Sequence, residues 1–197
     1  MWGKELFGTD LYHLVATFIL YSMLGWLVES IYMSFCNRRL TNRGFGKGPF
    51  CPIYGFGGTV GYLVMQPLRQ HVVLLYIVGA VLATSFEFLV AKLMKRFLGE
   101  VWWDYNDKPL NYQGIICAES TIAWGFYACI IVLFLNQKLV GFVDRYDQEF
   151  GELACTVVIV LEFIDYCVQL SKVFGHDWRH SRLVEKSVSV LRSIRPF

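Results

Sequence analysis

Carboxylate side chains inside apolar stretches are the residues of this sequence best suited to chemistry. In a membrane each costs about 3 kcal/mol or more unless it is paired or hydrated. Glu29, Glu87 and Glu119 each lie about five or six residues from one end of an apolar stretch, roughly 8 Å inside the same boundary. They could line a polar cavity, or each could pair with a basic or hydroxyl neighbour and only fix helix packing. Glu162 and Asp165 lie somewhat deeper, three residues apart, on one face of a further stretch.

A loop rich in glycine and proline, residues 41–58, joins two apolar stretches at this same depth. Glycine permits close backbone approach and proline fixes φ, so the loop can fold into a helix bundle. It would then present backbone amides, Asn42 and Arg43 to a ligand or to the carboxylates. Arg43 is the best candidate to neutralise Glu29 or Glu87. The alternative is a plain connector between helices, and the order of a phosphate-binding P-loop is absent.

An aromatic segment, residues 102–105, follows the third apolar stretch and a group of basic residues. Tryptophan and tyrosine favour the headgroup level of a bilayer, so the segment could be an interfacial anchor. It could also form the wall of the same cavity. In that case Trp103, Asp104, Tyr105 and Asn111 would surround the mouth of the cavity.

The cysteines and histidines predict no metal site and no disulfide framework. The six cysteines show no CxxC spacing, and several are expected on the reducing, cytoplasmic side, so we expect them to pack as apolar residues. We find no haem motif, nucleotide signature or Ser/His/Asp order, and we expect no cofactor. The net charge of +2 is too small to indicate a nucleic-acid partner.

Composition and apolar runs indicate the elements that must position these residues. Hydrophobic residues make up 55% of the 197 residues and charged residues 17%, against about 25% charged in soluble domains. A helix of roughly 20 apolar residues crosses a bilayer. We therefore predict an all-α, polytopic integral membrane protein with about five transmembrane helices, at residues 11–35, 51–67, 72–91, 114–135 and 152–174. The second is the weakest, since it is short and glycine-rich, with Gly57 and Gly61 spaced as a small-residue packing pair.

The basic residues predict the orientation. If the N-terminus is outside, all but four of the 18 lysines and arginines fall on the inner side, where basic residues are favoured. The exceptions are Lys4, Arg69, Lys138 and Arg145. We expect one transmembrane helical domain at residues 1–175 and a cytoplasmic tail at residues 176–197. The tail would be a basic amphipathic helix on an anionic inner leaflet, or a solvated segment packed on its own loops.

Several ordered motifs carry a family resemblance. They are Gly25-Trp26-Leu27-Val28-Glu29-Ser30, Asn42-Arg43-Gly44-Phe45, Gly48-Pro49, Cys51-Pro52-Ile53-Tyr54-Gly55, Trp102-Trp103-Asp104-Tyr105, Asn111, Gly114, Cys117, Ser120 and Trp124-Gly125. With these motifs, the chain from about residue 20 to residue 130 resembles the bacterial family named putative ABC-transporter type IV, also described as CmpB-like permeases. The resemblance implies a multi-pass protein of the bacterial cytoplasmic membrane with a role in transport.

The leading hypothesis is a small permease-type subunit that moves a small solute or ion through a polar cavity open to the cytoplasm. The residues expected to bind the ligand are Glu29, Asn42, Arg43, Glu87, Trp103, Asp104, Tyr105, Asn111 and Glu119. No nucleotide-binding motif is present, so transport driven by ATP would need a separate ATPase. Membrane lipids, another membrane subunit or a second copy of the chain are the other expected partners. The alternatives are a membrane-embedded enzyme acting on lipid, with Glu29 or Glu87 as general acid or base, and a non-catalytic scaffold. The sequence shows no complete catalytic set, which favours a transport subunit over an enzyme.

Overall fold

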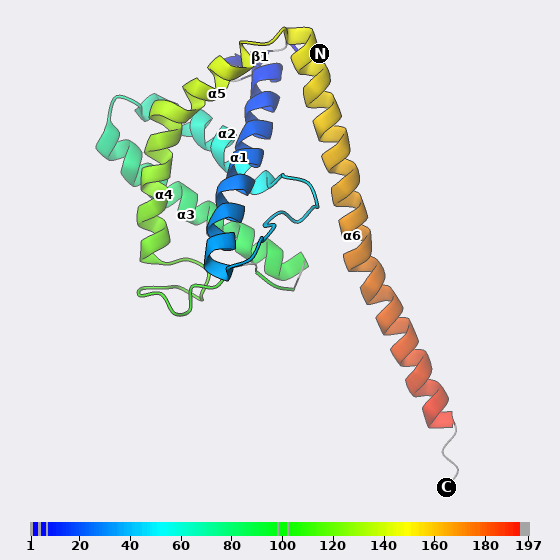
Figure 1. The fold of residues 1–197 in the computed structure, drawn as a ribbon. Coiled ribbons are helices and arrows are strands. Elements are labelled where there is room, and N and C mark those ends of the chain that lie inside the picture. The colour runs from blue at the N-terminus through cyan, green and yellow to red at the C-terminus, as the bar shows by residue number, and fades with distance from the viewer. Residues whose placement is uncertain (1, 4, 7, 98, 102, 194–197) are drawn as a thin grey trace.

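Helices make up most of the chain, as predicted (Figure 1). The computed structural model describes residues 2–193 except 4, 7, 98 and 102, and it describes side chains within residues 2–172 except 4–7, 98 and 102. The elements in chain order are β1 (Glu5–Leu6), β2 (Thr9–Asp10), α1 (Leu11–Asn37), α2 (Pro52–Met65), the 3-10 turn η1 (Gln66–Leu68), α3 (Val72–Phe97), α4 (Ala118–Ile130), the π-helical turn η2 (Ile131–Leu135), α5 (Asn136–Val143) and α6 (Gln148–Ser193). The short antiparallel pair β1–β2 is an addition to the predicted all-α class.

Four helical stretches are long and apolar enough to cross a membrane. They are Leu11–Asn37, Val72–Phe97, Ala118–Val143 and Gln148–Lys172. Helix α2 lies where a fifth crossing was predicted, but its 14 residues rise only about 21 Å, less than the roughly 30 Å of a hydrocarbon core. Pro67 in η1 has no N–H to continue the α-helical bonding, which limits α2 to this length.

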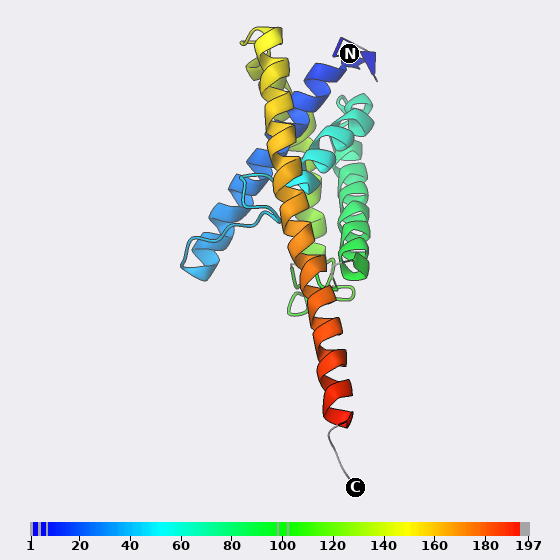
Figure 2. The same cartoon turned by 90° about the vertical axis from the view of Figure 1, so that its right-hand side faces the viewer.

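The helices alternate in direction, so their ends gather at two levels (Figures 1 and 2). The C-terminal ends of α1 and α3 and the start of α4 meet at one end, which we call the lower end because it lies at the bottom of Figure 1. The upper end holds β1, β2 and the junction of α5 and α6. Helix α6 continues below the other helices in both views. Residues 176–193, predicted as an amphipathic tail, belong to this extension, but their side chains and residues 194–197 lie outside the described part.

Helices α1 and α2 pack closely because α2 presents glycines to α1. A Cβ atom at Gly58 would lie 2.5 Å from the ring of Tyr21, and one at Gly55 would collide with side chains of α1. Such contacts are too short for any residue other than glycine. The close approach therefore uses Gly55 and Gly58 and not the predicted pair Gly57 and Gly61, which lie on other faces of the helix.

Two clusters of buried apolar side chains hold the bundle together. One joins α1 to α5 and α6 and contains Tyr12, Ala16, Ile19, Phe50, Val143 and Cys155. The other joins α2, α3, α4 and η2 and contains Met65, Leu75, Ala128 and Val132.

Candidate functional site

The Glu29 carboxylate lies in α1 toward the lower end, and both of its oxygens accept hydrogen bonds. Arg43 donates to its Oε1 from Nη2 at 2.8 Å and from Nε at 2.9 Å, and the Tyr54 hydroxyl donates to its Oε2 at 2.7 Å. The Glu29 side chain is 24% exposed and that of Arg43 is 19% exposed, so the ion pair is mostly shielded from solvent. The predicted pairing of Arg43 with one of the buried acids is therefore present, and its partner is Glu29.

Asn42 positions Arg43 by shaping the loop around it. Its Oδ1 accepts from the Trp26 indole at 2.6 Å and from the Gly44 amide at 2.9 Å. The Arg43 amide donates to Ser30 Oγ at 3.3 Å, which ties the loop to α1 next to the ion pair. The predicted ligand-binding residue Asn42 thus uses its side-chain oxygen to hold the loop on Trp26.

The Glu87 carboxylate, in α3, is buried with 6% of its surface exposed. Tyr105 donates its hydroxyl to Oε1 at 3.0 Å, and Trp124, on α4, donates its indole N–H to Oε2 at 2.8 Å. Both donors are neutral. Within the described part of the chain, Glu87 makes no ion pair with a lysine, arginine or histidine. It is a buried carboxylate with hydrogen bonds and no counter-charge.

The loop of residues 103–117 carries Tyr105 to Glu87. Trp103 donates its indole N–H to the Ile115 carbonyl at 2.8 Å, and the Tyr105 amide donates to the Gly114 carbonyl at 2.9 Å. Asp104 and Asn111 bond to groups within the same loop, to Asn106 and to the Gly114 amide among others. Trp103, Asp104 and Asn111, which were predicted to bind a ligand, therefore hold the loop that places Tyr105 at Glu87.

Tyr105 is a hydrogen-bond donor to the buried acid Glu87. Burial raises the pKa of Tyr105 well above that of a free tyrosine, and the charge of Glu87, the hydrogen bond to it and the charge of Glu29 raise it further. The phenol therefore stays protonated at neutral pH and can donate. The hydroxyl bonds to Glu87, and the two form a polar region toward the lower end.

Glu119 does not join this region. Its Oε2 pairs with Lys108 Nζ at 2.8 Å, and both side chains are exposed, 65% for Glu119 and 47% for Lys108. The predicted depth of Glu119 was wrong because α4 begins at Ala118, not at Gly114. Leu110, Gln113 and Gly114 have positive φ and belong to the preceding turns, which leaves Glu119 in the first turn of the helix.

The glycine-rich loop also contacts the carboxylates of α6. The amides of Lys47 and Gly48 donate to Asp165 Oδ2 at 2.5 and 3.2 Å. Glu162 lies against Gly48, and its Oε2 is buried without a hydrogen-bond partner in the described part. Sequence reasoning noted both acids but did not assign them to the site. The loop therefore lies between the Glu29–Arg43 pair on one side and α6 on the other.

One comparison identifies the chain. The family model described as Putative ABC-transporter type IV matches residues 16–170. This is most of the protein, and it includes the carboxylates of the candidate site and their hydrogen-bond partners. The chain belongs to the Putative ABC-transporter type IV family. No curated protein and no solved structure matches it. As a member of this family with four membrane-length helices, it is an ABC-transporter-related membrane protein.

Tyr54 and Trp124 are the site residues that sequence reasoning did not single out. Each donates to a buried carboxylate. Both fall within the motifs that resemble the ABC-transporter type IV family, which was the available signal. Their partners lie on other helices, so hydropathy and spacing alone could not pair them.

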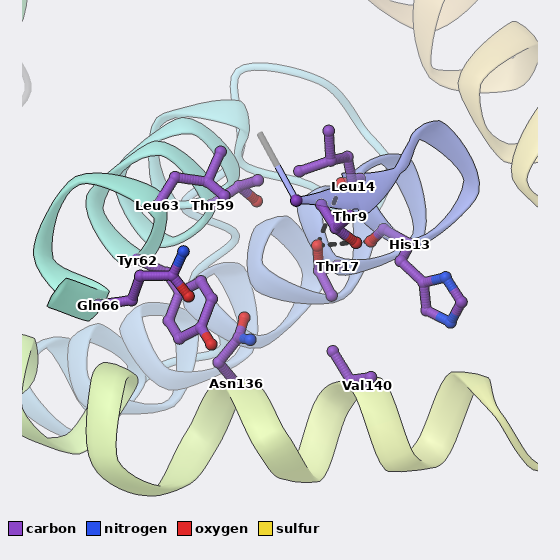
Figure 3. A pocket seen from close by; sticks show the side chains of 11 residues that line it. Thr9, His13, Leu14, Thr17, Thr59, Tyr62, Leu63, Gln66, Asn136 and Val140 are labelled. Atoms are coloured by element: carbon purple, nitrogen blue, oxygen red, sulfur yellow. Dashed lines mark hydrogen bonds between the residues drawn. The ribbon is translucent and has the colours of Figure 1, made fainter. Parts of the chain in front are cut away.

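A polar cavity of about 200 Å³ lies at the upper end (Figure 3). Hydroxyl and amide side chains from α1, α2 and the α5 region line much of it, among them Thr17, Thr59 and Asn136. His13 lies in its wall and bonds Asp10 through Nδ1 and Asp144 through Nε2. In the described residues, no group of three or more His, Cys, Asp or Glu residues could hold a metal ion.

Proposed function

We propose that the chain is a small permease-type subunit of the bacterial cytoplasmic membrane, which moves a small solute or ion. The observation that supports this most is the state of Glu87. It is a carboxylate in a membrane-length helix, 6% exposed, with neutral hydrogen-bond donors and no cationic partner in the described part of the chain. Ionisable groups of this kind in membrane proteins usually mark ion or proton paths, because burying them is costly.

The partners of Glu87 suit a group that changes charge. The Trp124 indole can only donate, so its bond to Oε2 remains whether the carboxyl group is ionised or protonated. The Tyr105 hydroxyl can donate to an ionised Oε1 or accept from a protonated one. Glu87 would therefore bind a proton or a cationic group without loss of its position.

The Glu29–Arg43 pair has a different role in this proposal. Its charges offset one another, and Tyr54 satisfies the second carboxylate oxygen. It would fix the glycine-rich loop over the lower end of the pathway, and the polar cavity at the upper end would admit the solute. We further propose five membrane crossings, with α2 as a shortened crossing packed on α1 through Gly55 and Gly58, the N-terminus outside and the C-terminus in the cytoplasm. A separate ATPase would supply energy if transport is driven by ATP.

The experiment is untargeted metabolite profiling of a deletion strain complemented with variants. Glu87→Gln keeps the size of the side chain and one acceptor oxygen for the Trp124 indole, and its amide nitrogen can donate to the Tyr105 hydroxyl, but it removes the charge. When this variant is present in the membrane at the wild-type level, we expect the strain to keep the metabolite profile of the deletion strain. Glu119→Gln is the matched control, because Glu119 is exposed on the adjacent helix, and it should restore the profile. Full restoration by Glu87→Gln would refute the proposed role of the carboxylate.

A further inference from the structure

The lower part of α1 carries a groove that the proposed function does not use. It has a volume of about 700 Å³ and lies between the last three turns of α1 and the segment of residues 38–42, which folds back beside the helix. Its wall is mostly apolar. Leu27, Ile31 and Phe35 follow one another at intervals of four residues, so they form one stripe along the helix.

This stripe is strongly exposed in the isolated chain. Leu27 is 44% exposed, Ile31 49% and Phe35 80%, and Leu40 on the opposite wall is 99% exposed. Eight residues of helix span about 12 Å, close to the roughly 15 Å thickness of one bilayer leaflet. The groove therefore has the length and the polarity to hold an acyl chain.

The open end of the groove carries positive charge. Arg38 and Arg39 line it, both are exposed, and neither forms an ion pair with a carboxylate in the described part of the chain. Arg38 has a positive φ of 51°, which ends the helix. The amides of Arg38 and Arg39 donate to carbonyl groups in the last turn of α1, so both arginines lie directly at the helix end. Both residues directly follow the membrane-length helix α1, and basic residues at such a helix end are suited to anionic headgroups.

The groove is also preformed. The Thr41 amide donates to Ser34 Oγ at 2.9 Å, and Trp26 at the deep end donates to Asn42 at 2.6 Å. These bonds fasten the segment of residues 38–42 to α1 at two points. A ligand would enter a shaped site and would not have to order a loose loop.

We propose that this groove binds one anionic phospholipid of the bilayer, with its phosphate on Arg38 and Arg39 and one acyl chain along Leu27, Ile31 and Phe35. An apolar helix from a partner could cover the stripe, but it would leave two guanidinium groups without counter-charge. A zwitterionic lipid would offset them less than a lipid with net negative charge. The bound lipid would cover Trp26 and Asn42, which hold the loop of Arg43.

The test uses the purified full-length chain in nonionic detergent and native mass spectrometry with dioleoylphosphatidylglycerol or dioleoylphosphatidylcholine. We expect the first phosphatidylglycerol to bind more tightly than phosphatidylcholine. Arg38→Gln together with Arg39→Gln should weaken that binding about 30-fold, the loss expected for two basic residues near an anionic headgroup. Arg38→Lys with Arg39→Lys should retain most of the affinity, because the charge remains.

The matched control is Lys95→Gln with Arg96→Gln, which removes two consecutive exposed basic residues from the last turn of α3 at the same end of the bundle. It should leave the affinity for the first phosphatidylglycerol unchanged. Three results would each overturn the proposal: equal binding of the two lipids by the wild type, equal weakening by the control, or a dimer mass that persists without lipid and disappears in the arginine variant.

Discussion

Replacement of Arg43 by alanine is the sharpest test of how the lower end is held together. Loss of one partner from a buried ion pair costs about 3–5 kcal/mol, because the other charge is left without compensation, whereas exposed pairs contribute about 0–1 kcal/mol. The Glu29 and Arg43 side chains retain 24% and 19% of their exposure, and Tyr54 still donates to Glu29 in the variant. We therefore expect a loss of about 2–3 kcal/mol, or roughly 5–10 °C in melting temperature for a chain of this length.

The assay is thermal unfolding in detergent, with two comparisons. Lys108→Ala removes the other lysine or arginine ion pair in the described part, which has the same 2.8 Å separation but exposed side chains, so its melting temperature should stay near that of the wild type. Arg43→Ala combined with Glu29→Gln should recover part of the loss, since no charge remains stranded. Equal, small shifts for Arg43→Ala and Lys108→Ala would show that the loop is a plain connector and that its ion pair is not shielded.

Two further predictions concern packing and topology. Gly58→Ala places a methyl group 2.5 Å from the Tyr21 ring and should lower stability by about 1–3 kcal/mol, whereas Gly57→Ala, whose Cβ has room at 3.8 Å from Phe86, should be neutral or stabilising in the same melt. Green fluorescent protein fused after Phe197 should fluoresce in the cytoplasm, and high alkaline-phosphatase activity at the same fusion point would contradict the proposed orientation.

The sequence was a good guide where an inference depended on local composition. The apolar runs predicted membrane-length helices at four of the five proposed positions. The sequence also predicted that Arg43 pairs with Glu29 or Glu87, because Arg43 is the only arginine in residues 41–58, and the structure identifies Glu29 as the partner. Both predictions needed only residues that are near in sequence and the cost of burying a charge in a membrane.

The inferences that failed depended on where helices begin and on which faces meet. Hydropathy continues through Gly114 and Ile115, so it did not show that α4 starts only at Ala118 after a turn with positive φ. Nor could it show that Gly55 and Gly58 face α1, since α2 is apolar on several sides. The contact of the Lys47 amide with Asp165 joins positions 118 residues apart and required the tertiary structure.

The two buried acids show why burial and local charge must be considered together. Glu29 and Glu87 resemble each other in sequence, each in an apolar helix near the lower end. Glu29 has a guanidinium partner, so its charge is offset and it can serve as a fixed element of the structure. Glu87 is more buried and has neutral donors only, so the free energy of its ionised form depends on what else enters the region. Tyr105 bonds to Glu87 and comes from a loop that α3 also holds, through the 2.6 Å bond from Lys92 Nζ to Gln113 Oε1. A displacement of that loop would change the partners of Glu87 and leave those of Glu29 in place, which makes Glu87 the acid whose charge state can be coupled to movement.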